Sequence, residues 1–361
     1  MNLKVLTVED QDPIRKQILM YFNEMEIGDH TISMEEAEDF DIGIEKIKNN
    51  DYDIVILDLC KGVPATENQE RPGYDVLQTI QSHSFTPVVF YTGLAHTIKE
   101  LSSDIVGVVN KNDGLETLES EITRIIHSNL GLIKKQVYEH IRVTFRDFFW
   151  EAVHEESEVF GKVKNDVSIG YLLLRRIANS LSKEEIKKLL KDDKIKTDKA
   201  HPMEFYLYPI KREAEFELGD IIKVDDKFYI TLTPTCDYVQ RANGTRKATN
   251  VLLASLENLE NFSQHTAYIS NKSNGNKKSL EKILSNNESD RYFFLPGTPF
   301  LESKVVDFQN KTMISYESLS QSKRIARLDT PFAQAMLASF IRYYNRIGFP
   351  DLDTEYIIAN V

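Results

Sequence analysis

The feature that most constrains the fold is a series of short, almost entirely apolar runs in the first third of the chain. Residues 53–58 read DIVILD, residues 87–91 read PVVFY and residues 105–109 read IVGVV. Runs without polar alternation are typical of strands that are buried on both faces, as in a parallel sheet. A similar run, Leu3–Val8, opens the chain and leads into two acidic residues. The sequence therefore predicts a sheet that is covered on both faces.

Stretches with a helical spacing of apolar residues separate these strands. They are expected over residues 13–24, 36–49, 74–82, 95–102 and 115–127. This alternation predicts an α/β fold with a doubly wound, five-stranded parallel sheet. Ligands of such sheets bind beyond the carboxyl ends of the strands, so the residues at those ends are the first candidates for a site.

Charge divides the chain into two regions of different character. Residues 1–128 carry 10 Lys and Arg against 24 Asp and Glu, whereas the other 233 residues carry 34 against 32. The acidic first region would repel phosphates, which argues against non-specific binding of nucleic acid there. Cys60 and Cys236 match no zinc or disulfide pattern, and no apolar run is long enough to span a bilayer. We therefore expect a cytoplasmic protein without a membrane partner.

Polar residues stand at the carboxyl ends of the predicted strands. Glu9 and Asp10 follow the first strand, Asp58 ends DIVILD, Thr92 follows PVVFY, and Lys111 comes shortly after IVGVV. The fold brings them to one edge, where three carboxylates would repel one another. A hard cation such as Mg²⁺ relieves that repulsion and keeps ligand positions for water or phosphate oxygens. With a hydroxyl and an ammonium group beside it, the set predicts phosphoryl transfer to a carboxylate.

In this order, the residues resemble the receiver domain of bacterial two-component response regulators. The resemblance covers residues 1–127 and rests on the following motifs: Glu9-Asp10, Asp58 in VILDL, Thr92 in YTG, Lys111 in VVNK, and the turn Pro72–Leu77 into the third helix. It implies a flavodoxin-like fold and a phosphoprotein that acts in a phosphorelay and in signal transduction.

The resemblance also implies a role for each residue. Asp58 would accept the phosphoryl group from a histidine kinase or phosphotransfer protein, Thr92 would hydrogen-bond that group, and Lys111 would form an ion pair with it. The implied cofactor is Mg²⁺, and its implied protein ligands are Glu9, Asp10, Asp58 and the backbone carbonyl oxygen of Cys60.

Three positions depart from the family pattern. Asp58 and Gly73 are separated by an extra segment, Gly62–Arg71, which could shield the site or offer a docking surface. Asn112 stands where the family has a proline, so a cis peptide bond after Lys111 cannot be presumed. Val108 stands where the family has an aromatic switch residue, which places the usual coupling to Thr92 in doubt.

Apolar residues recur every three or four positions from Ile122 to Ala152, which predicts one continuous helix with Gly131 as a point of bending. We expect residues 128–160 to link the receiver domain to a second domain. A homodimer formed through this linker helix is the alternative to a helix that covers its own second domain.

Residues 161–361 are predicted to form an α+β, β-rich domain with a small barrel or curled sheet. Its expected strands are residues 204–209, 220–224, 227–233, 250–255 and 291–295, with a hairpin over residues 304–314 and a loop over residues 270–276. Helices are expected over residues 170–180 and 183–191, and a last helix over residues 330–347. No helix-turn-helix pattern is found, so binding of nucleic acid is not expected.

Two other features of this half are candidate sites. Cys236-Asp237, with His201 and His265 elsewhere, could form a nucleophile, but a small buried cysteine at a strand end is the favoured interpretation. Residues 318–350 are rich in Arg and Lys and could bind a phosphate-rich ligand or the acidic receiver region, although an ordinary solvated helix face is favoured.

The sequence therefore predicts a phosphoacceptor signalling protein rather than an enzyme, with a second domain that binds a partner other than DNA. Two alternatives stay open: a receiver-gated enzyme with a nuclease-like second domain, and a phosphate sink without output. The architecture also resembles that of receiver proteins encoded in bacterial anti-phage two-component-like operons, which implies a setting in anti-phage defence.

Overall fold

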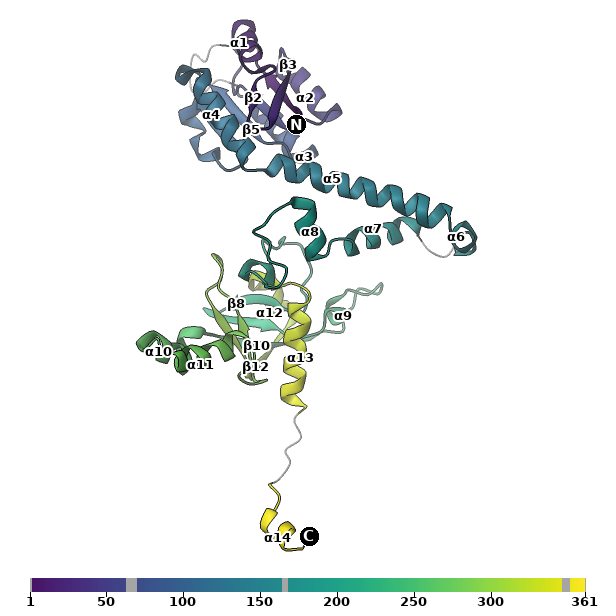
Figure 1. Cartoon of the computed structure of the whole chain (residues 1–361), viewed down its shortest axis with the longest axis vertical. Coiled ribbons are helices and arrows are strands. Elements are labelled where there is room, and N and C mark those ends of the chain that lie inside the picture. Colours follow the sequence, from purple (N-terminus) through teal and green to yellow (C-terminus); the bar gives the residue numbers. More distant parts are fainter. Residues whose placement is uncertain (1, 63–69, 164–167, 346–350, 361) are drawn as a thin grey trace. The chain divides into compact units, whose positions relative to one another are not determined.

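The computed structural model describes residues 2–62, 70–163, 168–345 and 351–360. The chain divides into two compact units, Met1–Ile195 and Lys196–Val361 (Figure 1). The predicted domain limits at residues 127 and 160 stay a prediction. Across the described ranges, no helix is both long enough and apolar enough to cross a membrane.

The first unit contains a six-stranded sheet in the order β2-β3-β1-β4-β5-β6. Its strands are β1 (Asn2–Val8), β2 (Glu26–Ile27), β3 (His30–Ala37), β4 (Ile54–Leu57), β5 (Val88–Thr92) and β6 (Val106–Asn110). All pairs are parallel except that of β2 with β3. The predicted α/β fold with a parallel sheet is confirmed, but the described sheet has six strands rather than five because the short strand β2 adds an antiparallel edge.

Four α-helices cover this sheet: α1 (Asp12–Phe22), α2 (Phe40–Asn49), α3 (Gly73–His83) and α4 (Gly114–His127). Side chains of α2 and α3 pack on one face, and side chains of α1 and α4 pack on the other. Successive strand residues point to opposite faces: Leu6 packs with α2 and α3, and Val5 packs with α1 and α4. Both faces are therefore dry, which explains why the strands are apolar throughout.

Two expected helices differ from the structure. Helix α2 begins at Phe40 rather than residue 36, because the Asp39 side chain accepts the Ile42 N–H at 2.8 Å and caps the helix there. Residues 95–102 form two 3-10 turns, Ala95–Thr97 and Lys99–Leu101, rather than one α-helix. The Thr97 hydroxyl donates to the Leu94 carbonyl at 2.9 Å, a local bond that competes with regular helix.

The predicted continuous helix from Ile122 to Ala152 is wrong. Helix α4 ends at His127, Asn129 takes a left-handed conformation with φ 58°, and α5 (Leu130–Asp147) begins after it. Asparagine is one of the few residues that adopt this conformation readily, so the chain turns there and not at Gly131. A π-helical segment, Phe148–His154, continues α5.

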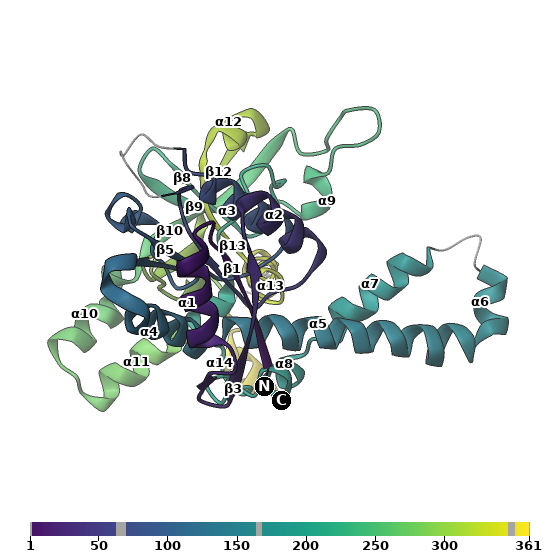
Figure 2. The ribbon, with the colours of Figure 1, turned by 90° about the horizontal axis from the view of Figure 1, so that it is seen from above.

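Three further helices follow α5 in the first unit: α6 (Ser157–Val163), α7 (Ile169–Asn179) and α8 (Lys183–Leu190). Helix α7 runs beside α5 in both views of the ribbon, and α5 contacts α7 and α8 (Figures 1 and 2). The His140 imidazole and the Ser180 hydroxyl, 2.8 Å apart, join α5 to the end of α7. We call residues 130–190 the helical arm.

The second unit contains a seven-stranded antiparallel sheet in the order β11-β12-β10-β9-β8-β13-β7. Its strands are β7 (Tyr206–Leu207), β8 (Asp220–Val224), β9 (Lys227–Thr231), β10 (Asn250–Asn258), β11 (Tyr292–Leu295), β12 (Lys304–Ser315) and β13 (Lys323–Leu328). Its α-helices are α9 (Thr235–Tyr238), α10 (Ser263–Ser270), α11 (Asn274–Leu284), α12 (Tyr316–Gln321), α13 (Phe332–Tyr344) and α14 (Thr354–Ala359).

Three features of this unit differ from the expectations. Residues 304–315 form one strand with a bulge opposite β10 rather than a hairpin. The expected loop over residues 270–276 is shorter, because the Ser273 side chain accepts the Asn276 N–H and starts α11. Residues 323–328, which lie in the basic segment interpreted as a helix face, form strand β13 instead.

Candidate functional site

The polar residues predicted at the strand ends lie at one edge of the first sheet. Glu9 follows β1, Asp58 follows β4, Thr92 ends β5 and Lys111 follows β6, and these four strands are neighbours in the sheet. Glu9, Asp58 and Thr92 are 1%, 3% and 0% exposed. The structure therefore brings the predicted set together in a buried position.

Lys111 connects two of the carboxylates. Its Nζ lies 2.7 Å from Glu9 Oε2 and 2.7 Å from Asp58 Oδ2. The other oxygen of Asp58, Oδ1, accepts the Leu59 N–H at 2.7 Å. One ammonium group thus faces two buried carboxylates, so the charge of the pair is only half compensated.

The third carboxylate, that of Asp10, has an oxygen available. Its Oδ2 accepts the Gly62 N–H at 2.7 Å, whereas its Oδ1 is buried and has no hydrogen-bond partner within the described ranges. Ligand oxygens of Glu9, Asp10 and Asp58 all lie within 4.8 Å of one another. Oxygen donors of this kind are what Mg²⁺ prefers, so the residues present fit a magnesium ion.

Burial and charge shift the protonation of this cluster. Burial, reinforced by the negative charge of Asp58, raises the pKa of Glu9 to about 7 in spite of the nearby Lys111 ammonium. Burial alone would lower the pKa of Lys111, but the charges of Asp58 and Glu9 outweigh it and raise that pKa. Lys111 therefore stays charged at neutral pH, while Glu9 is close to the midpoint of its titration.

Gly73 allows α3 to start against the end of β4. A Cβ at residue 73 would lie 2.4 Å from the backbone oxygen of Asp58 and 2.9 Å from the Cα of Leu59. No larger residue fits without a shift of the backbone that carries Asp58. Cys60, whose carbonyl oxygen the receiver resemblance adds to the metal ligands, follows in the same buried stretch, and burial raises the pKa of its thiol.

Asn112 and Val108, which depart from the pattern of receiver domains, each have defined contacts in the structure. Among the described residues, cis peptide bonds precede Pro209 and Pro331 only, so the bond after Lys111 is trans. The Asn112 N–H donates to Asn110 Oδ1 at 2.9 Å, a bond that a proline could not form. Val108 packs against the core of the face that carries α2 and α3. Most of the extra segment Gly62–Arg71 lies outside the described residues.

Sequence reasoning missed one residue that shapes this site. Arg15, on α1, is buried, and its Nη1 donates to the backbone oxygen of Glu9 at 2.9 Å. The same guanidinium forms ion pairs with Asp12 at 2.8 Å and Glu36 at 2.9 Å. Arg15 thus fixes the end of β1. Its only sequence signal is its position one helical turn after an acidic residue, which is common on helix surfaces.

Thr92 has its hydroxyl at the same edge, where its Oγ1 accepts the Leu94 N–H at 3.3 Å. The neighbouring Tyr91 hydroxyl donates to the Lys111 backbone oxygen at 3.3 Å. This second bond ties β5 to the chain that carries Lys111. The hydroxyl and the ammonium group predicted to contact a phosphoryl group therefore belong to strands that are connected at their ends.

In the second unit the favoured interpretation of Cys236 is wrong. Cys236 is exposed on the short helix α9 rather than buried, and its Sγ lies 3.7 Å from Asp237 Oδ1. His201 accepts the Met203 N–H through Nδ1, and His265 lies on α10. Neither histidine has a hydrogen bond to Cys236 within the described ranges, so the structure assembles no nucleophile there.

The basic segment over residues 318–350 is only in part the solvated helix face that was the favoured interpretation. Arg324 and Arg327 lie on β13, and both form ion pairs with Asp220, which is completely buried. Arg342, on α13, pairs with Asp290 at 3.0 Å, and Arg346 lies outside the described residues. Part of the positive charge of this segment is therefore compensated inside the unit.

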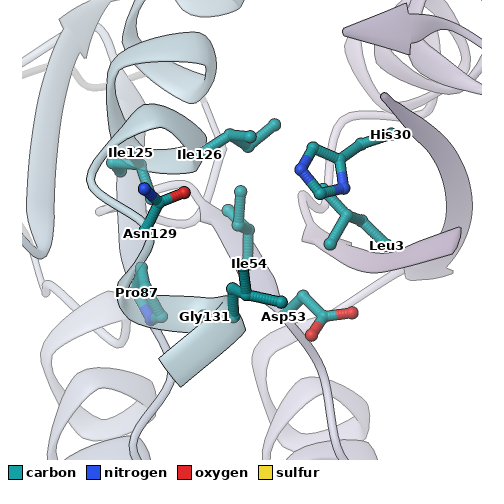
Figure 3. Close-up of a pocket in the computed structure, with 10 residues that line it drawn as sticks. Leu3, His30, Asp53, Ile54, Pro87, Ile125, Ile126, Asn129 and Gly131 are labelled. Carbon is teal, nitrogen blue, oxygen red and sulfur yellow. The ribbon is translucent and has the colours of Figure 1, made fainter. Parts of the chain in front are cut away.

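A small cavity lies at the opposite end of the first sheet (Figure 3). Its labelled residues include His30, Asp53, Ile126 and Asn129, and the ring of His30 faces the cavity. The volume of about 30 Å³ is enough for one or two water molecules and too small for an organic ligand. This cavity is therefore not a candidate ligand site.

Comparison with known proteins gives structural neighbours that cover about a third of the chain, and these are response-regulator receiver domains. Response regulator protein TrrA from Thermotoga maritima, in complex with Mg²⁺-BeF, is 22% identical, with 34% of this chain and 98% of that chain covered and a TM-score of 0.27. The receiver domain of Francisella response regulator 1452 is 25% identical, with 36% and 96% covered and a TM-score of 0.26.

A CheY-like receiver domain protein from Methanospirillum hungatei JF-1 is 21% identical, with 36% of this chain and 99% of that chain covered and a TM-score of 0.24. No protein-family model matches the chain, and no curated protein matches it. The neighbours therefore cover about 35% of the chain.

Proposed function

We propose that this chain is a response-regulator-type phosphoacceptor protein that receives a phosphoryl group on Asp58. The donor is a histidine kinase or a histidine phosphotransfer protein. Mg²⁺ is the cofactor, held by Glu9, Asp10 and Asp58 together with the backbone carbonyl oxygen of Cys60. When bound, Mg²⁺ supplies positive charge that offsets the carboxylates and the incoming phosphoryl oxygens.

The observation that carries this proposal is the position of Lys111 between two buried carboxylates. Its ammonium group lies 2.7 Å from both Glu9 and Asp58, beside an Asp10 oxygen without a hydrogen-bond partner. A purely structural ion pair would need one carboxylate, and burying two of them beside a partly exposed third one costs stability. The excess of negative charge is understandable if the site binds a cation in its working state.

The residues of this chain define the chemistry of transfer. An Asp58 carboxylate oxygen attacks the phosphorus of a phosphohistidine, the P–N bond breaks, and the imidazole nitrogen leaves with the electron pair. The product is an acyl phosphate on Asp58. The Leu59 N–H holds Oδ1, which leaves Oδ2, on the side of Lys111, as the nucleophile. Lys111 then pairs with the phosphoryl group, and the Thr92 hydroxyl donates to it.

The test is phosphorylation of the full chain by acetyl phosphate with Mg²⁺, followed by intact mass and peptide mapping. We expect one phosphoryl group on Asp58, and none in Asp58→Asn. Asp53→Asn is the matched control, because Asp53 is a buried aspartate at the other end of β4 and should leave the modification unchanged. Modification of any residue other than Asp58 would contradict the assignment.

The remaining parts of the function stay predictions. The second unit is proposed to bind a protein partner rather than DNA. Dimerisation through residues 128–160, a setting in anti-phage defence and the phosphate-sink alternative are likewise expectations. A phosphorylation-dependent change of mass by light scattering separates a signalling protein from a sink. The nuclease-like alternative loses the support of Cys236, which has no histidine partner within the described ranges.

A further inference from the structure

The second unit contains a pocket of about 660 Å³ that the proposed phosphoacceptor function does not use. Two segments line it, one before β8 and the other at the junction of α12 and β13. The lining residues are Ile210, Arg212, Phe216, Ser320, Gln321, Ser322, Lys323 and Arg324. None of these eight residues is acidic, and three of them are cationic. A pocket of this composition in an acidic protein points to an anionic ligand.

Arg324 forms the fixed part of this pocket. Its guanidinium donates to the backbone oxygens of Ala214 at 2.6 Å and Glu215 at 3.0 Å, and it pairs with Asp220 at 3.3 Å. Its planar group also lies 4.4 Å from the centre of the Phe216 ring. One buried side chain thus fixes the wall of residues 211–216, so the pocket does not depend on a mobile loop for its shape.

Asp220 and Arg327 support that wall from behind. Arg327 Nε lies 2.8 Å from Asp220 Oδ1 and Nη2 lies 3.0 Å from Oδ2, a two-pronged ion pair in the interior. Arg327 also donates to the backbone oxygen of Glu215 and pairs with Glu217. The backbone oxygens of Ala214 and Glu215 are therefore occupied by guanidinium groups, which lessens their repulsion of an anion.

The two other cations of the pocket are available. Arg212 and Lys323 are exposed, and neither has an ion-pair or side-chain hydrogen-bond partner within the described ranges. The hydroxyls of Ser320 and Ser322 donate to the backbone oxygens of Glu317 at 2.7 Å and Leu319 at 2.6 Å. These bonds satisfy carbonyl oxygens of α12 that would otherwise disfavour negative charge.

We propose that this pocket binds a phosphate-bearing organic molecule of the size of a nucleoside diphosphate. Arg212 and Lys323 contact the phosphate oxygens, because a guanidinium fork and an ammonium group are the usual protein partners of phosphate. Ile210, which is partly exposed, offers apolar surface to the rest of the ligand. The volume lies in the range of pockets for small organic ligands and exceeds what inorganic phosphate needs.

The test separates this pocket from the Asp58 site. The full chain with Asp58→Asn is titrated by calorimetry in EDTA, with ADP, pyrophosphate and adenosine as probes. We expect ADP to bind more tightly than pyrophosphate, and adenosine not to bind. Arg212→Ala and Lys323→Ala should each weaken ADP binding by about tenfold, the loss of one hydrogen bond to a charged group. Lys278→Ala, an exposed lysine on α11, is the matched control and should bind as the parent does.

If ADP binds to both variants as tightly as to the parent, the proposed position of the site is wrong. Absence of ADP and pyrophosphate binding at millimolar concentration would overturn the ligand class. Pyrophosphate that binds as tightly as ADP would overturn the assignment of an organic ligand. Because both substituted side chains are exposed, we expect unchanged thermal unfolding of the variants, and the same calorimeter can record it. Phosphorylation of Asp58 in the wild type does not enter any of these outcomes.

Discussion

Replacement of Lys111 by methionine removes the ammonium group between Glu9 and Asp58 and keeps a side chain of similar length. Each carboxylate lies 2.7 Å from Lys111 Nζ and is almost completely buried, so the variant leaves two buried charges without a cation. Breaking a buried pair in this way typically costs about 3–5 kcal/mol. We therefore expect the first unit of Lys111→Met to be less stable by about 3 kcal/mol at pH 8 without Mg²⁺.

The pH dependence follows from Glu9, whose pKa is raised to about 7 from 4.5. A carboxyl group whose pKa is raised on folding contributes stability that is present below its unfolded pKa and is lost as the pH rises through the folded pKa. Wild-type stability should therefore fall between about pH 5 and pH 8. The deficit of Lys111→Met should be smaller at pH 5.5, where Glu9 is protonated and carries no charge to compensate.

Hydrogen exchange of the β4 amides, followed by mass spectrometry, measures the stability of the first unit within the full chain. Saturating Mg²⁺ should recover part of the deficit, because the ion replaces the missing positive charge. Lys135→Met is the matched control, since Lys135 pairs with Asp53 at 2.8 Å at the other end of β4, away from the acidic cluster. A Lys111→Met protein as stable as the wild type at pH 8, or equal rescue of both variants by Mg²⁺, would contradict this prediction.

Two further predictions concern packing and charge elsewhere. Gly73→Ala should slow phosphorylation of Asp58 by about 10- to 100-fold, because its methyl group would displace the Asp58 backbone. Gly131→Ala, where a Cβ meets no atom within 4 Å, should leave the rate unchanged. Equal rates in the two variants would contradict this prediction. Burial raises the pKa of Asp307, but its two hydrogen bonds to Arg291 outweigh burial and lower that pKa. Asp307→Asn should therefore reduce the free energy of unfolding of the second unit by about 1.5–3 kcal/mol at pH 7, and by less as the pH falls toward 3. A loss that does not depend on pH in denaturant unfolding would refute this prediction.

The strand-end cluster could be predicted from sequence because its signals are local. A buried parallel strand is apolar along its whole length, so Asp58 at the end of DIVILD is conspicuous, and the order of strands then brings Thr92 and Lys111 to the same edge. What joins them is not local. The ion pair of Lys111 with Glu9 links residues about a hundred positions apart, and the role of Arg15 depends on the backbone of Glu9.

The errors have physical causes of the same kind. Strand β13 has the sequence KRIARL, whose arginines are not typical of a buried strand. Their partner Asp220 is more than a hundred positions away, so the sequence gives no local sign that their charge is compensated. The polar residues in the middle of β12 read as a turn, although the strand continues there through a bulge against β10. The spacing of apolar residues persists across Asn129 because the helices on both sides of the break are amphipathic, so periodicity alone could not locate it.

The break at Asn129 changes how a signal could leave the proposed phosphoacceptor site. A rigid helix from α4 into α5 is not available, but α5 is tied to the sheet by another contact. Lys135 Nζ lies 2.8 Å from Asp53 Oδ2, and the same oxygen accepts the Lys4 N–H at 2.8 Å. Strand β4 is only four residues long, so Asp53, which meets the helical arm, and Asp58 flank the same rigid element.

We therefore expect a phosphoryl group on Asp58 to alter the dynamics of the helical arm through β4. Beryllofluoride with Mg²⁺, as a phosphoryl mimic, should change hydrogen exchange over residues 130–136 in the wild type. In Lys135→Met the change should vanish, although the mimic still protects the amides near Asp58, because the tie between β4 and α5 is lost. Exchange that changes equally in both proteins would show that another contact carries the signal. Exchange that changes in neither would make the arm a passive spacer and favour the phosphate sink.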